Sequence, residues 1–168
     1  TNKTQKMPSN VITFGINIDS QIDILKKYFN EIDVSKLLLL YPKKKFINQT
    51  DIVRNSDLKF SKVFPYEVSP KKITKEIQNL TKYHDRKKDL ERRILILEKS
   101  DLYKDKQELK ILEQKHTLGK VNFDSVLIID FGERLKSVLT SFMFSDVSSE
   151  KIAFFTINQW FDETFFNE

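Results

Sequence analysis

The segment from Phe123 to Leu135, FDSVLIIDFGERL, constrains the fold more than any other part of this sequence. Its unbroken apolar run, residues 126–129, ends at Asp130, and Gly132 and a helical spacing of apolar residues follow. A strand that is apolar at consecutive positions has both faces buried, which is typical of a parallel sheet covered by helices on both sides. Asp130 would then lie at the carboxyl end of the strand, where open α/β sheets place their ligand crevices.

The same reasoning predicts strands and helices in alternation along the chain. The predicted strands span residues 11–16, 34–41, 58–68, 125–130 and 152–157. Helical spacing of apolar residues fills 19–32, the region from Lys71 onward, and a segment from Glu133 whose apolar side includes Met143. Residues 43–55 fit either a loop or a short helical turn capped by Thr50 or Asp51. This order predicts a three-layer α/β/α sandwich, Rossmann-like, with a mainly parallel sheet.

A helical hairpin is predicted over residues 71–116. We expect a long helix and a return helix on either side of a polar break at Ser100-Asp101, with Gly119 in a left-handed conformation beyond them. The charge clusters Arg86-Lys87-Lys88 and Arg92-Arg93 are interpreted as solvated helix faces. A coiled coil is the alternative, and the polar break and the short run of heptads weaken it.

Composition limits the chemistry that this chain can carry. Its 168 residues correspond to one domain, and no apolar run approaches the roughly 20 residues needed to span a bilayer. The absence of cysteine excludes disulfides, thiolate catalysis and cysteine-based metal sites, and two histidines are too few for a His-rich site. The net charge of +5 comes from 29 basic and 24 acidic residues that are interspersed, so nucleic-acid binding is not expected. Three glycines argue against a glycine-rich phosphate loop, and no cofactor is expected.

No catalytic constellation is convincing. Asp130-Phe131-Gly132 matches the magnesium-binding tripeptide of protein kinases, but the other kinase motifs are missing and His84-Asp85-Arg86 has the wrong order for a catalytic loop. Glu133 lies near Asp130, yet an acidic residue in a first helical turn is explained by the helix dipole. His84 and His116 fall on the polar hairpin. We therefore predict that the protein is not an enzyme.

Trp160 is the most notable single residue. It follows the last predicted strand, where it could be a ligand platform, an interface anchor or a side chain that closes the core. Phe165 and Phe166 lie nearby in the sequence. If they are exposed, they would mark a surface that another part of the protein or a partner normally covers. The candidate ligand or partner cleft at the carboxyl ends of the strands comprises Tyr41, Tyr66, Asp130, Glu133 and Trp160.

The opening segment is similar to one in the penicillin-binding-protein activators of the bacterial periplasm, which have a type 1 periplasmic-binding fold. Other landmarks occur in the same order: Phe14-Gly15, Asp19-Ser20-Gln21, Phe64-Pro65-Tyr66, Thr117-Leu118-Gly119 and Trp160-Phe161-Asp162. The resemblance extends from about Val11 to Asp162. The chain departs from the family at Lys43–Asn48, at Phe131 and at Thr156-Ile157, where family glycines are replaced or a helix start is shortened.

The resemblance implies that residues 1–168 form one lobe of a bilobed protein, with an ordered core at about 11–162 and the first lobe missing. The polar start, Thr1–Asn10, resembles the middle of a chain. The implied function is that of a non-catalytic periplasmic lipoprotein, tethered to the outer membrane, that activates a class A penicillin-binding protein in peptidoglycan synthesis. The alternative is the solute-binding component of an ABC transporter for a small polar, amino-acid-like ligand. A third hypothesis, a flavodoxin-like enzyme, is weakened because Tyr41-Pro42-Lys43-Lys44 offers lysines but no glycine.

Overall fold

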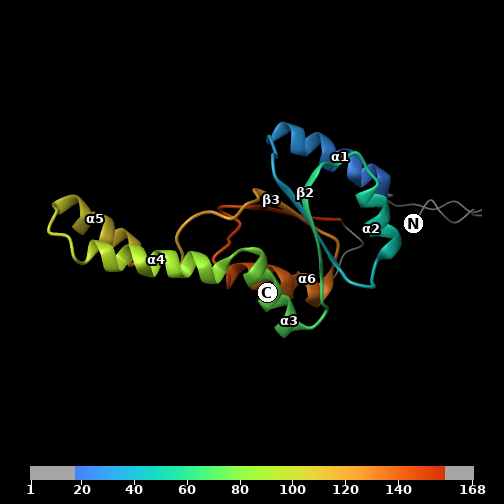
Figure 1. Ribbon diagram of the computed structural model, residues 1–168. Helices are drawn as coiled ribbons and strands as arrows, with labels where there is room; N and C mark the ends of the chain where they lie inside the picture. The colour runs from blue at the N-terminus through green and yellow to red at the C-terminus, as the bar shows by residue number, and fades with distance from the viewer. Residues whose placement is uncertain (1–17, 158–168) are drawn as a thin grey trace, which may run out of the picture.

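The structure, a computed structural model, describes residues 18–157, which form a four-stranded parallel sheet between two layers of helices (Figure 1). The strands are β1 (Leu37–Pro42), β2 (Phe60–Tyr66), β3 (Ser125–Ile128) and β4 (Ala153–Thr156). The helices are α1 (Ile18–Glu31), α2 (Ile47–Arg54), α3 (Pro70–Leu80), α4 (Tyr83–Leu97), α5 (Tyr103–Leu112) and α6 (Gly132–Met143). The predicted α/β/α class is confirmed. The strand predicted at 11–16 lies outside the described residues.

The strand order is β2-β1-β3-β4, and all three neighbouring pairs are parallel. Leu38 of β1 lies opposite Val126 of β3, and Leu40 lies opposite Ile128. The chain leaves β1 toward β2 on one side and leaves β3 toward β4 on the other. The carboxyl ends of β1 and β3 therefore mark the point where the strand order reverses, the usual position of a ligand crevice in such sheets.

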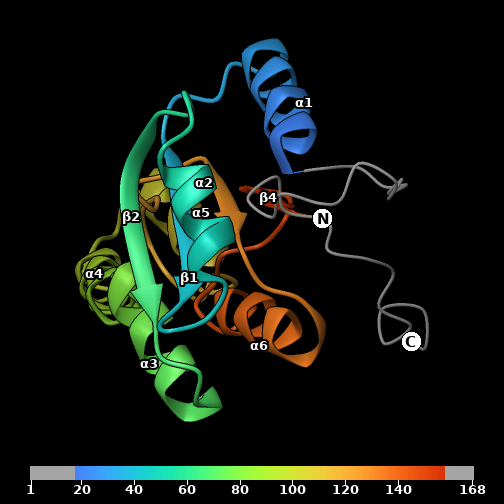
Figure 2. The same ribbon diagram turned by 90° about the vertical axis from the view of Figure 1, so that its right-hand side faces the viewer.

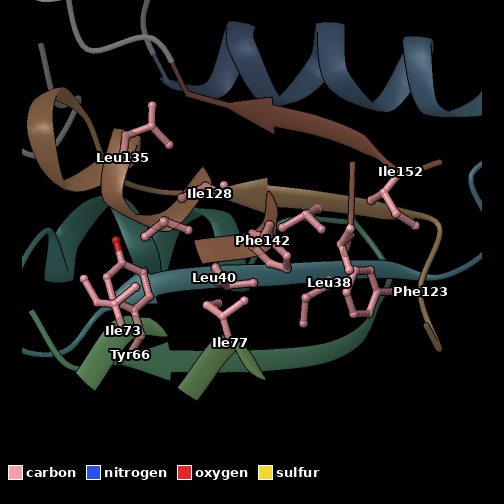
Figure 3. Packing of buried hydrophobic residues seen from close by; sticks show 13 residues of the cluster. Leu38, Leu40, Tyr66, Ile73, Ile77, Phe123, Ile128, Leu135, Phe142 and Ile152 are labelled. Atoms are coloured by element: carbon pink, nitrogen blue, oxygen red, sulfur yellow. The ribbon is translucent and has the colours of Figure 1, made fainter. Parts of the chain in front are cut away.

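Two hydrophobic cores lie on opposite faces of the sheet, and the central strands supply both. Leu38, Leu40, Val126 and Ile128 face α3 and α6, whereas Leu37, Leu39, Leu127 and Ile129 face α1 and α2. Figure 3 shows the first core, where Ile73 and Ile77 of α3 and Leu135 and Phe142 of α6 pack with Leu38 and Leu40. Figure 2 shows α2 and α6 on opposite sides of the strands. The burial of consecutive residues in both β1 and β3 confirms the interpretation of their apolar runs.

The second strand, β2, is an edge strand of the described sheet. Most of its residues are exposed or half-buried, and it carries Lys62 and Pro65. Lysine and proline are tolerated at a sheet edge, where the outer backbone groups have no neighbouring strand.

The open assignment of residues 43–55 resolves in favour of a helix, α2. Neither Thr50 nor Asp51 caps it, because both lie inside the helix and Thr50 is buried. The N-cap position is Phe46, which has a left-handed backbone conformation with a φ of 52°.

The predicted long helix from Lys71 is wrong, because the chain breaks at Thr81-Lys82. Lys82 has a φ of 52°, so α3 ends at Leu80 and covers the sheet, while α4 and α5 form the hairpin that extends away from it (Figure 1). Proline starts α3, as predicted. Gly119 does have a positive φ, 88°, although it lies well beyond the last residue of α5.

The burial of four residues also differs from the prediction. Arg86 belongs to a cluster interpreted as a solvated face, yet it is 8% exposed, and its Nη2 donates a hydrogen bond to the Ser145 carbonyl at 2.6 Å. Met143, predicted to be buried, is exposed because α6 ends there. Tyr28, in the last turn of α1, and Ile32, just after it, belong to the apolar side predicted for residues 19–32 but are 46% and 43% exposed.

Candidate functional site

The candidate site is built around Asp130, which follows β3 at the carboxyl edge of the sheet. The side chain is fully buried. It accepts hydrogen bonds from the Tyr66 hydroxyl of the edge strand and, at 2.9 Å, from the Phe131 backbone N–H. The Asp130 carbonyl accepts a 3.2 Å bond from the Thr156 hydroxyl of β4. Asp130 therefore links the ends of β2, β3 and β4.

Arg134 neutralises this buried carboxylate. It lies in the first turns of α6, four residues after Asp130, a spacing that places the two side chains on the same side of the helix start. Its Nη2 lies 2.9 Å from Asp130 Oδ1, and its Nε lies 3.1 and 3.2 Å from the two carboxylate oxygens. A buried charge is tolerated when it is paired and its lone pairs are satisfied, and Asp130 meets both conditions.

Two aromatic rings contact the Arg134 guanidinium. Its central carbon lies 5.6 Å from the centroid of Phe46 and 5.5 Å from that of Phe131, within the range of cation–π attraction. The two rings are themselves 5.1 Å apart. Phe131 is 38% exposed, so its ring presents an apolar surface. The ring packs on Arg134, which the ion pair with Asp130 holds in position.

Tyr66 acts as a permanent hydrogen-bond donor in this network. Burial, followed by its hydrogen bond to the Asp130 carboxylate, raises the pKa of Tyr66 well above its ordinary value. The hydroxyl therefore stays protonated over the whole physiological range.

A second, more exposed network lies at the same edge. Lys43 Nζ is 3.0 Å from Glu67 Oε1 and 3.8 Å from Glu76 Oε1, and the Glu67 backbone N–H donates to Glu76 Oε2 at 2.9 Å. The hydrogen bond to Glu67 raises the pKa of Lys43, and the same bond lowers the pKa of Glu67. These charges are solvated, so the network connects the loops that follow β1 and β2 without contributing much to stability.

The structure brings together two of the five predicted site residues, Tyr66 and Asp130. Tyr41 is half-buried and packs against the core on the α1/α2 face, and Glu133 is exposed and lies 3.8 Å from Lys136. Trp160 lies outside the described residues, as do Phe165 and Phe166. His84 and His116 are exposed on the hairpin and on the loop after it.

The sequence interpretation missed Arg134 and Phe46. The four-residue spacing from Asp130 to Arg134 was a signal that could have identified the ion pair. Phe46 offered none, because it reaches the site through an unusual backbone conformation after a run of lysines.

Within residues 18–157 there is no group of three His, Asp or Glu side chains placed to hold a metal ion. No helix in this same part of the chain is long and apolar enough to cross a membrane.

Comparison with known proteins gives no family assignment: no protein-family model, no curated protein and no solved structure matches the chain. The similarity to the penicillin-binding-protein activators stays a prediction made from the sequence.

Proposed function

We propose that this chain is a non-catalytic binding domain that contacts a partner protein through the carboxyl edge of its sheet. The observation that carries the proposal is the Phe131 ring, partly exposed and held against Arg134, which Asp130 fixes in place. Aromatic and arginine side chains carry most of the energy in protein interfaces, particularly where a rigid support reduces the entropy lost on binding.

The pairing of Asp130 supports this proposal over a solute receptor. A receptor for an amino-acid-like ligand needs a free acceptor for the α-amine and free donors for the α-carboxylate. At this edge Asp130 and Arg134 are the natural groups for those tasks, and they neutralise each other. A ligand would have to break a buried ion pair, which is costly.

The resemblance suggests the kind of partner. We propose a class A penicillin-binding protein, in a periplasmic setting in which a first lobe precedes this chain and a lipid anchor tethers the whole protein to the outer membrane. A partner of this kind would meet a surface in which the Phe131 ring lies against Phe46, the residue that follows the lysines of residues 43–45.

The test is a binding measurement with Phe131→Ala. We expect this variant to bind a purified class A penicillin-binding protein about tenfold more weakly, as for an interface anchor. Phe144→Ala is the matched control, because Phe144 is also exposed but follows the last residue of α6, at the opposite edge of the sheet. Equal binding by wild type and Phe131→Ala, or equal weakening in both variants, would refute the proposal.

A second measurement addresses the receptor alternative. Thermal unfolding of the wild type with L-glutamate or L-leucine should show no stabilisation. A rise in melting temperature that Asp130→Asn abolishes would instead favour a solute receptor with its site at this edge.

A further inference from the structure

A pocket of about 770 Å³ lies at the opposite, amino-terminal edge of the sheet. Its walls include Lys36, which precedes β1, Asp124, which precedes β3, and Ile152, which precedes β4. Arg86 from the base of α4 and the loop from Gln114 to Val121 complete it. Figure 1 shows this loop running from the hairpin back to β3 beside α4. The volume lies within the range of small-molecule sites, which is about 300–1,000 Å³.

Positive charge predominates in the lining. The five cationic side chains are Lys36, Arg86, Lys115, Lys120 and Lys151, and the two carboxylates are Asp124 and Asp146. His116 also lines the pocket.

Both carboxylates accept hydrogen bonds from the protein, whereas one oxygen of Asp124, Oδ1, is buried and has no hydrogen-bond partner among the described residues. Asp124 Oδ2 accepts hydrogen bonds from the Ser35 backbone N–H at 3.1 Å, the Ser35 hydroxyl at 2.7 Å and the Lys36 backbone N–H at 2.9 Å. Asp146 accepts a hydrogen bond from the Thr117 hydroxyl and pairs with Lys151 at 3.4 Å. Lys115 and Lys120 form no ion pair with any residue in 18–157, so their charges are available to a ligand.

Arg86 is the unusual member of the lining. Its side chain is among the few buried charged groups of the fold, and one nitrogen, Nη2, donates to the Ser145 carbonyl. Its Nε is buried and has no hydrogen-bond partner among the described residues. Because an unsatisfied buried donor is costly, such a group often indicates an acceptor that belongs to a bound ligand.

One part of the wall is apolar. It consists of Leu118, Val121, Phe123, Val147 and Ile152. A ligand that fills the pocket therefore needs an apolar body as well as a negative charge.

We propose that this pocket binds a small organic anion, whose carboxylate or phosphate is held by Arg86, Lys115 and Lys120 and whose apolar body lies against Leu118 and Val121. The site is separate from the carboxyl-edge surface around Phe131. It would add a small-molecule ligand to a domain proposed above to bind a protein.

Three probes with the same aromatic body test the charge requirement. Calorimetric titration of the whole chain with 2-naphthoate, 2-naphthyl phosphate and the neutral 2-naphthamide should show binding of at least one anion. The amide should bind at least about tenfold more weakly, the loss expected when a charge-assisted hydrogen bond is removed. A preference between the two anions identifies the carboxylate or the phosphate as the favoured group. Binding of neither anion, or equal binding of the amide, would overturn the proposal.

Paired substitutions locate the binding site. The double variant Lys115→Gln/Lys120→Gln should bind the tighter-binding of the two anions about tenfold more weakly than the wild type. Lys87→Gln with Lys88→Gln removes the same charge from exposed positions of α4 that do not line the pocket, and should change the affinity by less than about twofold. All four positions are exposed, so both double variants should fold. An equal effect of the two pairs would mean that net charge, and not the pocket, attracts the anion.

Discussion

Two aspartates, Asp124 and Asp130, bracket β3, and each connects the strand to another part of the sheet. Asp124 joins it to the loop before β1 through Ser35 and Lys36. Asp130 joins it to Tyr66 of β2. The sequence suggested a ligand site for Asp130, yet both carboxylates fix strand ends. A carboxylate that fixes a strand end and a carboxylate that binds a ligand both lie where backbone and side-chain donors converge, so the sequence does not distinguish the two roles.

Asp124→Ala should lower the free energy of unfolding at neutral pH by about 1–3 kcal/mol, because three donors lose their acceptor. Burial alone would raise the pKa of Asp124, but hydrogen bonds from Ser35, Ser125 and Lys36 together lower it below its ordinary value of 3.8. A depressed pKa in the folded state means that the stabilisation is fully present above 3.8 and is lost as the pH falls through the folded-state pKa.

Urea denaturation of wild type and variant at about pH 6 and about pH 3 measures this contribution. The difference between the two proteins should shrink at the lower pH. A difference that is the same at both pH values would show that Asp124 stabilises the fold through its shape and not through its charge.

At the scale of single residues, the sequence predicted where a residue lies along a strand, but it predicted only some of the side-chain hydrogen bonds and ion pairs. Tyr66 and Asp130 could be placed at one edge because the carboxyl ends of parallel strands meet there. Arg134 was within reach, through its four-residue spacing from Asp130. Arg86 was not, since its carbonyl partner on Ser145 lies 59 residues away and its neighbours in the sequence are charged and exposed.

At the scale of elements, the sequence did not predict the break between α3 and α4. Apolar residues continue at helical spacing across it, and nothing in the type of residue marks Lys82 as left-handed, since glycine or asparagine is usual there. The break separates a helix that covers the sheet from one that leaves it, so it decides where the hairpin points.

Lys82→Gly should therefore stabilise the protein, by about 0.5–1 kcal/mol, because glycine adopts a φ of 52° without the steric cost that lysine carries. Lys75→Gly, at an exposed position inside α3, is the control and should destabilise by about 1 kcal/mol. Thermal and urea unfolding of the three proteins measure both effects. Destabilisation by both glycines would indicate that Lys82 leaves its left-handed conformation in solution.

At the scale of the molecule, the described chain has two parts with different amounts of core. The sheet and its four covering helices bury two clusters, whereas the α4–α5 hairpin buries Leu90, Leu97 and Leu112 in a cluster of its own. The fold class was predictable because doubly buried strands leave few alternatives. The exposure of Leu95, Ile96 and Leu102 on the hairpin was not predictable. A periodic pattern of apolar residues does not show how much of a helix face is covered by other elements.

This division predicts that the hairpin opens without the sheet. Leu97→Ala removes a nearly fully buried side chain and should lower the local stability of the hairpin by about 2–5 kcal/mol. A cluster with three buried leucines is too small to stay closed after such a loss. Amide hydrogen exchange in α5 and the outer turns of α4 should become fast, while protection in β1 and β3 is unchanged. The base of α4 should stay protected, because the Arg86 carbonyl accepts the Leu118 backbone N–H at 3.0 Å and its guanidinium is bound to Ser145.

Ile96→Ala is the matched control, because Ile96 is the preceding residue of the same helix but is largely exposed. It should leave exchange in the hairpin almost unchanged. If Leu97→Ala instead accelerates exchange in β1 and β3 as much as in α5, the hairpin and the sheet unfold as one cooperative unit. The loop that lines the anion pocket would in that case owe its position to the outer hairpin. If the exchange stays local, Arg86 and Thr117 still hold the inner wall of the pocket to the body of the fold. Leu118 packs against the hairpin cluster, so the affinity for the anion should fall but not vanish.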